Sequence, residues 1–151
     1  LPNKYIAIAL GGEWPYRTYN KWNEVIEELS IKDPSLNIVI VGSSNAKDTS
    51  KAIMEKLYNN NIFDCVDKFT FNQTTEIINN ASVLLCCDGG LMHAANASKK
   101  TIIVLLARLT AEMQLTDSSS AYVVYDKIDV NNIELSSVLK KYNEAIYSLN
   151  L

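Results

Sequence analysis

Six short apolar segments, separated by stretches of helical periodicity, constrain the fold of this chain more than any other feature. The apolar segments span residues 4–10, 37–41, 62–66, 82–87, 101–106 and 122–125. The second, fourth and fifth are apolar almost without interruption, which is typical of strands buried on both faces of a sheet. The stretches predicted to be helices span residues 19–30, 47–59, 73–80, 91–97 and 135–149. This alternation predicts an α/β fold, a Rossmann-like doubly wound parallel sheet with helices on both faces.

The composition excludes several other classes of protein. The chain has 151 residues, of which 48% are hydrophobic, as expected of one folded domain rather than a disordered segment. Its formal net charge is −3, so we expect no nucleic-acid partner. No apolar run approaches the roughly 18 residues that a membrane helix needs. Because a strand-like segment begins almost at once and no initial Met is present, we expect a processed chain or part of a longer one.

The cysteines and the absence of familiar motifs narrow the chemistry. With only Cys65, Cys86 and Cys87, a disulfide framework is excluded, because the neighbours Cys86 and Cys87 point to opposite faces of a strand. No Cys or His spacing suggests zinc, so we expect no metal. We also expect no cofactor, and the lack of a disulfide framework indicates a reducing, cytoplasmic setting. The sequence contains no GxGxxG, Walker A, nucleophile-elbow or HExxH motif.

The loop after the fourth apolar segment is the strongest candidate for a binding site. Asp88 ends that segment, Gly89 and Gly90 turn the chain, and His93 falls in the first turn of the next helix. Unpaired N–H groups at a helix start attract phosphate, and glycines let a ligand approach the backbone. We expect His93 to add a donor and Asp88 to orient loop amides or His93. A structural turn with a capping histidine is the competing interpretation.

Two further loops should lie at the same edge, because ligands bind beyond the carboxyl ends of parallel strands. In residues 11–17, Arg17 could hold a phosphate through its planar guanidinium, or could be a solvated surface charge. Trp14 and Trp22 could pack the helix onto the sheet, and this interpretation is favoured for Trp22. Residues 42–48 are polar and lie where a ribose or phosphate would bind, although serines and Asn are also ordinary turn residues.

Taken together, these loops resemble glycosyltransferase family 9, the heptosyltransferases. Residues 80–105 are similar to the family's donor-site segment, a strand, then Asp-Ser/Thr-Gly-x-x-His-x-Ala-x-Ala, and another apolar strand. Residues 16–22 look like the family's Lys-Arg-Trp-Pro segment, with Arg17 in the place of the lysine. Residues 38–43 resemble its strand ending in Gly-Gly, and residues 109–112 its Gly-Pro-Thr-x-Pro-Glu stretch. The chain departs from the pattern at Gly89, where Ser or Thr is usual, at Lys100 and at residues 107–108.

The resemblance implies that residues 1–151 form the carboxyl-terminal half of a two-domain GT-B enzyme. The amino-terminal acceptor domain, with the Asp thought to act as base, would be absent from this chain, which then holds no catalytic residue. The residues that would contact the donor diphosphate are Gly89, Gly90, His93 and Arg17, with Asp88 orienting them. Those near the ribose or base would be Ser43, Ser44 and Asp48. Those on the sugar side would be Thr110 and Glu112.

The function implied by the resemblance is donor binding in an inverting, metal-independent glycosyltransferase of lipopolysaccharide or lipooligosaccharide core synthesis. The donor would be a nucleotide sugar like ADP-heptose, and the acceptor would bind through the other domain. The enzyme would be cytoplasmic, and the implied role is compatible with peripheral association with the inner face of the bacterial inner membrane. One alternative is a non-catalytic, flavodoxin-like or receiver-like module, although its first strand would precede acidic residues rather than Gly11 and Gly12. Another is half of a different GT-B enzyme, such as a nucleotide-sugar epimerase.

Overall fold

A six-stranded parallel sheet forms the centre of the molecule. The computed structural model describes residues 1–57 and 59–149. The strands lie in the order β3-β2-β1-β4-β5-β6, and every neighbouring pair is parallel. Their bounds are β1 Ile6–Ala9, β2 Ile38–Val41, β3 Ile62–Asp64, β4 Leu84–Cys87, β5 Ile102–Ala107 and β6 Ala121–Asp126. This arrangement confirms the predicted doubly wound, Rossmann-like α/β fold.

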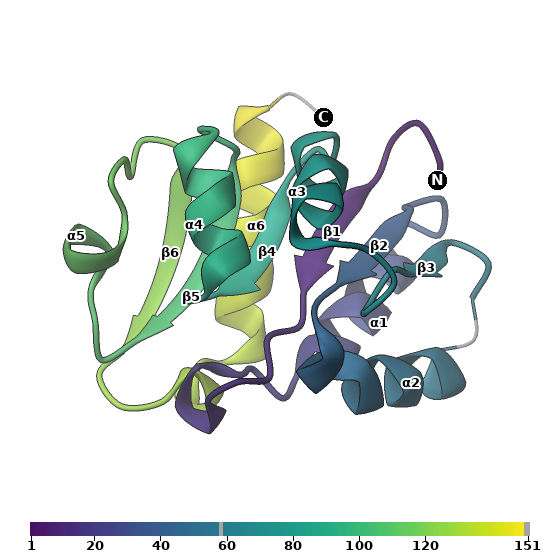
Figure 1. The fold of residues 1–151 in the computed structure, drawn as a ribbon, viewed down its shortest axis with the longest axis horizontal. Helices are drawn as coiled ribbons and strands as arrows, with labels where there is room; N and C mark the ends of the chain where they lie inside the picture. Colours follow the sequence, from purple (N-terminus) through teal and green to yellow (C-terminus); the bar gives the residue numbers. More distant parts are fainter. Residues whose placement is uncertain (58, 150–151) are drawn as a thin grey trace.

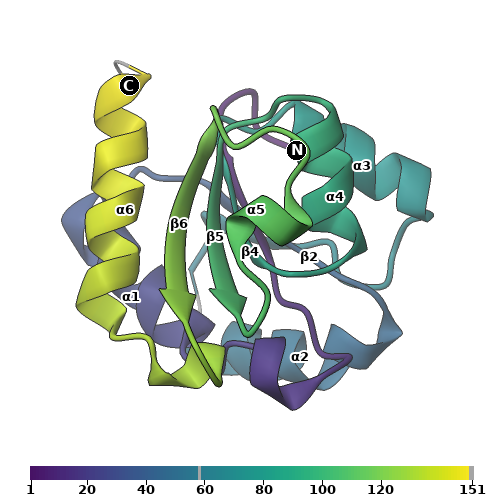
Figure 2. The same ribbon diagram turned by 90° about the vertical axis from the view of Figure 1, so that its left-hand side faces the viewer.

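Helices cover both faces of the sheet (Figures 1 and 2). One face carries α1 (Trp22–Lys32), α2 (Lys47–Lys56) and α6 (Leu135–Ser148). The other face carries α3 (Phe71–Asn79), α4 (Gly90–Ala97) and the short α5 (Ala111–Gln114). The described residues also form three single-turn 3-10 helices: η1 (Pro15–Arg17), η2 (Ser44–Ala46) and η3 (Val130–Asn132).

The apolar core is divided by the sheet into two clusters, because successive strand side chains point to opposite faces. Ile8 packs with α1 and α6 on one side, whereas its neighbour Ala7 faces α3 and α4. In the same way Cys86 and Cys87 lie on opposite faces, as predicted, and both thiols are free. Every residue of β2, β4 and β5 is buried, which explains why these segments lack alternation.

Several predicted helix boundaries are wrong by a few residues. The helix predicted to begin at Gln73, capped by Asn72 or Thr74, begins at Phe71 with Thr70 as its N-cap. The Thr70 hydroxyl accepts a hydrogen bond from the Gln73 N–H, and the Gln73 side chain accepts one from the Thr70 N–H. This reciprocal pair satisfies two N–H groups that would otherwise be unpaired at the helix start. The helix predicted over residues 47–59 ends at Lys56; Tyr58 lies outside the described residues.

The strand order places the candidate site. From β1 the chain continues to β2 and β3 on one side, and it then crosses back to form β4 on the other side of β1. A crevice opens beyond the carboxyl ends of the strands at such a reversal. Within residues 1–57 and 59–149, no helix is both long and apolar enough to cross a bilayer.

Candidate functional site

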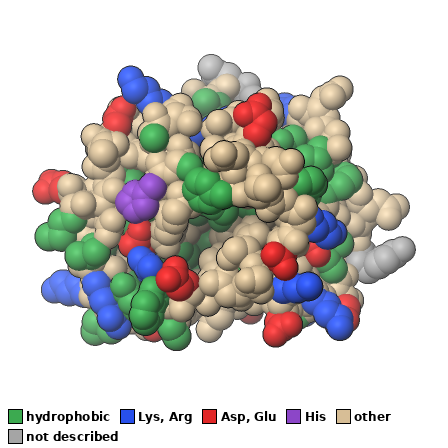
Figure 3. Space-filling view, in the orientation of Figure 1, with side chains coloured by type: hydrophobic (Ala, Val, Ile, Leu, Met, Phe, Trp, Pro, Cys, Tyr) green, Lys and Arg blue, Asp and Glu red, His purple; other side chains and the backbone are tan. Residues whose placement is uncertain are grey.

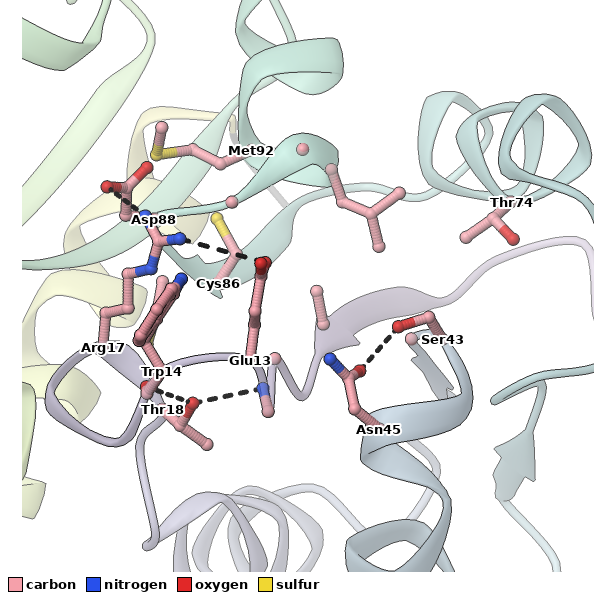
Figure 4. Close-up of a pocket in the computed structure, with 18 of the residues that line it drawn as sticks. Glu13, Trp14, Arg17, Thr18, Ser43, Asn45, Thr74, Cys86, Asp88 and Met92 are labelled. Atoms are coloured by element: carbon pink, nitrogen blue, oxygen red, sulfur yellow. Dashed lines mark hydrogen bonds and ion pairs between the residues drawn. The ribbon is translucent and has the colours of Figure 1, made fainter.

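A pocket of about 280 Å³ opens at the carboxyl ends of β1 and β4, at the reversal of strand order. Its walls are the loops after β1, β2 and β4 and the connection from β3 to α3 (Figures 3 and 4). Of the residues predicted to bind a ligand, it is lined by Arg17, Ser43, Asp88, Gly89 and Gly90. Its volume is near the lower end of the range for small-molecule sites.

An ion pair between Arg17 and Asp88 joins the loops after β1 and β4 (Figure 4). Arg17 Nη1 lies 3.1 Å from Asp88 Oδ2. The Asp88 side chain is only 7% exposed and that of Arg17 is 22% exposed, so solvent screens this pair weakly. Arg17 Nη2 also lies 3.9 Å from the exposed Glu13 carboxylate. The Arg17 guanidinium is thus held at the edge of the pocket before any ligand binds.

The loop after β1 has a compact conformation that depends on Gly12. A Cβ at Gly12 would lie 2.7 Å from the backbone oxygen of Asn45, and its φ of +126° is one that other residues rarely adopt. The Thr18 hydroxyl accepts from the Gly12 N–H at 3.1 Å and donates to the Trp14 carbonyl at 2.7 Å. Gly12 therefore lets the loops after β1 and β2 touch, while Thr18 holds the turn.

The start of α4 presents backbone N–H groups without partners. Gly89, the N-cap, has an extended backbone and no side chain that could accept a hydrogen bond from these N–H groups. The described residues offer no acceptor to the N–H groups of Gly90, Leu91 and Met92; the next, of His93, bonds to the Gly89 carbonyl at 3.1 Å. Nothing lies within 4 Å of the position that a Gly89 Cβ would occupy, so space for a ligand adjoins these donors. The helix dipole and three N–H groups would therefore favour the binding of an anion here.

His93 is close to this helix start but outside the pocket lining. Its Nε2 lies 3.6 Å from Asp88 Oδ1, and its side chain is 52% exposed. The purple side chain in Figure 3, the single histidine of the chain, is accordingly visible at the surface. Asp88 thus lies between Arg17 and His93. Asp88 was expected to orient His93 or the loop amides, and His93 does lie beside it. The closer contact of Asp88 with Arg17 was not predicted.

Of the other predicted residues, Ser43 reaches the pocket, whereas Ser44, Asp48, Thr110 and Glu112 do not. Ser43 lines it and donates to Asn45 Oδ1 at 2.6 Å. Ser44 and Asp48 are exposed on η2 and α2, and neither is among the described residues of the lining. Thr110 and Glu112, at the start of α5, are likewise outside it.

Aromatic side chains form part of the pocket rim, and the sequence motifs did not predict them there. Trp14 is 51% exposed, and Phe69 and Phe71 are 48% and 56% exposed; all three line the pocket. Trp14 therefore does not pack a helix onto the sheet, whereas Trp22 does, at 1% exposure. The sequence carried one signal, two phenylalanines in the short polar connection between a strand and a helix. Exposed apolar side chains that gather around one pocket, unlike scattered ones, commonly mark a binding surface.

The thiols at the floor of the pocket are unsuited to nucleophilic chemistry. Burial raises the pKa of the Cys87 thiol to about 12 and raises the pKa of Cys86 well above its ordinary value. Both therefore stay protonated near neutral pH. Across the described part of the chain, no three His, Cys, Asp or Glu side chains are grouped so that they could hold a metal ion.

Comparison with protein families supplies the deciding observation. The family model of glycosyltransferase family 9 (heptosyltransferase) matches residues 1–125, most of the chain. The chain belongs to glycosyltransferase family 9. The predicted resemblance is thereby confirmed. No curated protein matches the chain.

Solved structures of heptosyltransferases share the fold of this family 9 chain. E. coli ADP-heptose LPS heptosyltransferase II has a TM-score of 0.81 at 17% identity, covering 99% of this chain and 48% of that one. A family 9 glycosyltransferase from Veillonella parvula has a TM-score of 0.83 at 13% identity, covering 97% and 47%. E. coli heptosyltransferase WaaC with ADP has a TM-score of 0.81 at 14% identity, covering 94% and 44%. This chain thus spans about half the length of these proteins.

Proposed function

We propose that this chain is the donor-binding half of a glycosyltransferase and that its pocket binds the diphosphate of a nucleotide sugar. The carrying observation is the juxtaposition of the Arg17 guanidinium with the unpaired N–H groups at the start of α4. A diphosphate needs several donors and positive charge on one side, and these groups come from two loops that the ion pair to Asp88 joins. WaaC, a structure of the same fold, was solved with ADP.

In the proposed mechanism, these groups stabilise the charge that develops on the leaving diphosphate when the bond to the sugar breaks. Backbone N–H groups of Gly90 and Leu91 would donate to phosphate oxygens, and Arg17 would neutralise part of their charge. Asp88 would touch Arg17 and His93 rather than the anion, since a carboxylate beside a phosphate would repel it. His93 would reach the diphosphate from the rim.

The remaining contacts are proposals drawn from the predicted residues and from the pocket. Ser43, with Ser44 and Asp48 further out, would serve the ribose or base, and Thr110 and Glu112 the sugar side. The exposed ring of Phe69 offers a surface on which a base could stack. These assignments leave acceptor activation to residues outside this chain.

The whole protein would be an inverting, metal-independent glycosyltransferase of lipopolysaccharide core synthesis, with a heptose-like donor. Its acceptor would bind through a second α/β half, which would also supply the base. We therefore expect residues 1–151 alone to bind nucleotide yet to transfer little or no sugar. The receiver-like module considered above is disfavoured by family membership.

Calorimetric titration with ADP, UDP, GDP and CMP tests the proposal directly. We expect saturable, nucleoside-selective binding, weakened about tenfold to a hundredfold by Arg17→Ala, since a hydrogen bond between charged groups is lost. Lys51→Ala is the matched control, because Lys51 is an exposed cation on α2 outside the pocket. Absence of binding to all four nucleotides, or equal weakening by both substitutions, would refute the proposal. Sugar transfer by the isolated chain would refute the expectation of inactivity.

A further inference from the structure

The loop that carries Arg17 is held in place from the opposite end of the chain. Residues 12–20 contain no strand or α-helix, only the single turn η1. Such a segment would leave the Arg17 side chain free to move unless other residues fixed its backbone. The residues that do so lie in the connection from β6 to α6, more than a hundred positions later in the sequence.

Asn131, in η3, makes the central contacts. Its Oδ1 accepts from the Asn20 N–H at 2.8 Å, and its Nδ2 donates to the Thr18 carbonyl at 3.0 Å and to the Pro15 carbonyl at 3.3 Å. The amide group of one side chain thus bonds to the backbone on both sides of Arg17. Figure 2 shows the two segments together below the sheet, where the purple turn η1 lies beside the chain that leaves β6.

Asn131 is itself fixed. Its N–H and its Nδ2 both donate to the Asp129 carboxylate, at 2.8 and 3.0 Å. A second contact between the same two regions runs through Arg108, whose guanidinium lies 3.7 Å above the Tyr16 ring while its Nε donates to the Ile128 carbonyl at 3.1 Å. Both contacts converge on η1, so the connection from β6 to α6 supports the turn that ends at Arg17.

We propose that Asn131 is a positioning residue for nucleotide binding, which keeps the backbone around Arg17 in the conformation that places its guanidinium at the pocket. This inference rests on the proposed function and extends it to a residue beyond the region 1–125 that the family model matches. Asn131 does not line the pocket, so it acts through Arg17 and not on the ligand.

The first experiment measures the loop without any ligand. Hydrogen–deuterium exchange of residues 12–20 should speed up at least severalfold in Asn131→Ala, whereas exchange in β4 and α4 should stay as in the wild type. Asn132→Ala is the matched control, because Asn132 is the next residue of η3 and its side chain donates to Asp126 Oδ2, at the end of β6, at 3.2 Å. Among the described residues it makes no hydrogen bond to residues 12–20. Equal exchange in the two variants, or faster exchange throughout the molecule, would overturn the inference.

The second experiment measures nucleotide affinity in a double-mutant cycle. Asn131→Ala should weaken binding of the tightest nucleotide about threefold to tenfold, the cost of ordering a side chain on binding. The same substitution should have no effect in an Arg17→Ala background, because there is no guanidinium left to position. An undiminished effect in that background, or none in the wild type, would overturn the inference. Failure of the wild type to bind nucleotide would instead refute the proposed function, and the exchange experiment would still decide the role of Asn131.

Discussion

The loops after β1 and β4 and the loops after β2 and β5 occupy the same edge of the sheet, yet they differ in how they pack. The first two are joined by the ion pair between Arg17 and Asp88, and both line the pocket. The second pair leads into α2 and α5, where Asp48 and Glu112 are exposed and outside the pocket. The loop after β2 reaches the lining through Gly42, Ser43 and Asn45, whereas the loop after β5 adds no residue to the described lining. All four loops follow the carboxyl ends of strands, which is where ligands bind in parallel sheets. The difference shows that this rule selects an edge, while the reversal of strand order selects the place along it.

The largest expected difference concerns two glycines of the pocket. Gly12→Ala should lower the free energy of unfolding by about 3 kcal/mol, because the new Cβ meets a backbone oxygen and φ is unfavourable. Gly89→Ala should change it by less than about 0.5 kcal/mol, because its surroundings are open. Chemical denaturation of both variants measures this. Similar losses in the two would contradict the distinction between a glycine required by packing and one that leaves space.

Two aspartates provide the next comparison. Asp88→Ala should cost about 2 kcal/mol of unfolding free energy, because the largely buried Arg17 guanidinium loses its charged partner. Asp48→Ala should cost about 0.5 kcal/mol, through the dipole of α2 alone. Denaturation curves for both, together with the Arg17→Ala and double variants, isolate the pair. A double variant whose loss equals the sum of the single losses would show that the two charges do not stabilise each other.

A gain of affinity should follow from Gly89→Ser. The new hydroxyl would enter the open space beside the start of α4 and donate to a phosphate, so nucleotide binding should strengthen about threefold to tenfold. Gly89→Ala controls for the added bulk, and Ser136→Ala, at an exposed position on α6 outside the pocket, should leave affinity unchanged. Calorimetry with the tightest nucleotide measures all three. Weaker binding by the serine variant alone would place the phosphates elsewhere.

The smallest expected effect is a pH dependence in the connection that supports η1. Hydrogen bonds from the N–H groups of Asp129 and Ile128 lower the pKa of the Asp126 carboxyl below its ordinary value. A lowered pKa means that Asp126 stabilises the fold above its ordinary pKa of 3.8 and loses this contribution as the pH falls through the folded value. Asp126→Asn should therefore flatten the acid limb of the stability curve slightly, as measured by thermal unfolding between pH 5 and 2. An unchanged acid limb would contradict the prediction.

Most of the fold was predictable because burial leaves a direct record in the sequence. Strands β2, β4 and β5 are covered on both faces, and their uninterrupted apolar residues indicate this burial. Helix ends were less predictable, as at α3, where Thr70 and Gln73 rather than Asn72 or Thr74 form the cap. Several neighbouring residues have side chains that can cap a helix, and only the folded backbone determines which of them does so.

The site was predictable only in part. The glycines after β4 and the cation after β1 could be found, because phosphate binding has a recognisable chemistry. The contact of Arg17 with Asp88 could not, since it joins residues 71 positions apart. Nor could the role of Asn131, an ordinary turn residue whose partners lie 111 to 116 positions earlier.

From its sequence alone, this chain is committed to a parallel α/β sheet with a glycine-rich helix start, because apolar periodicity and glycine conformation act over a few neighbouring residues. Tertiary structure decided which loops meet. Strand order set β1 beside β4 and so brought a guanidinium to the start of α4, while the return of the chain after β6 brought Asn131 under η1. Those contacts depend on how distant segments pack, and a local pattern of residues carries no record of them.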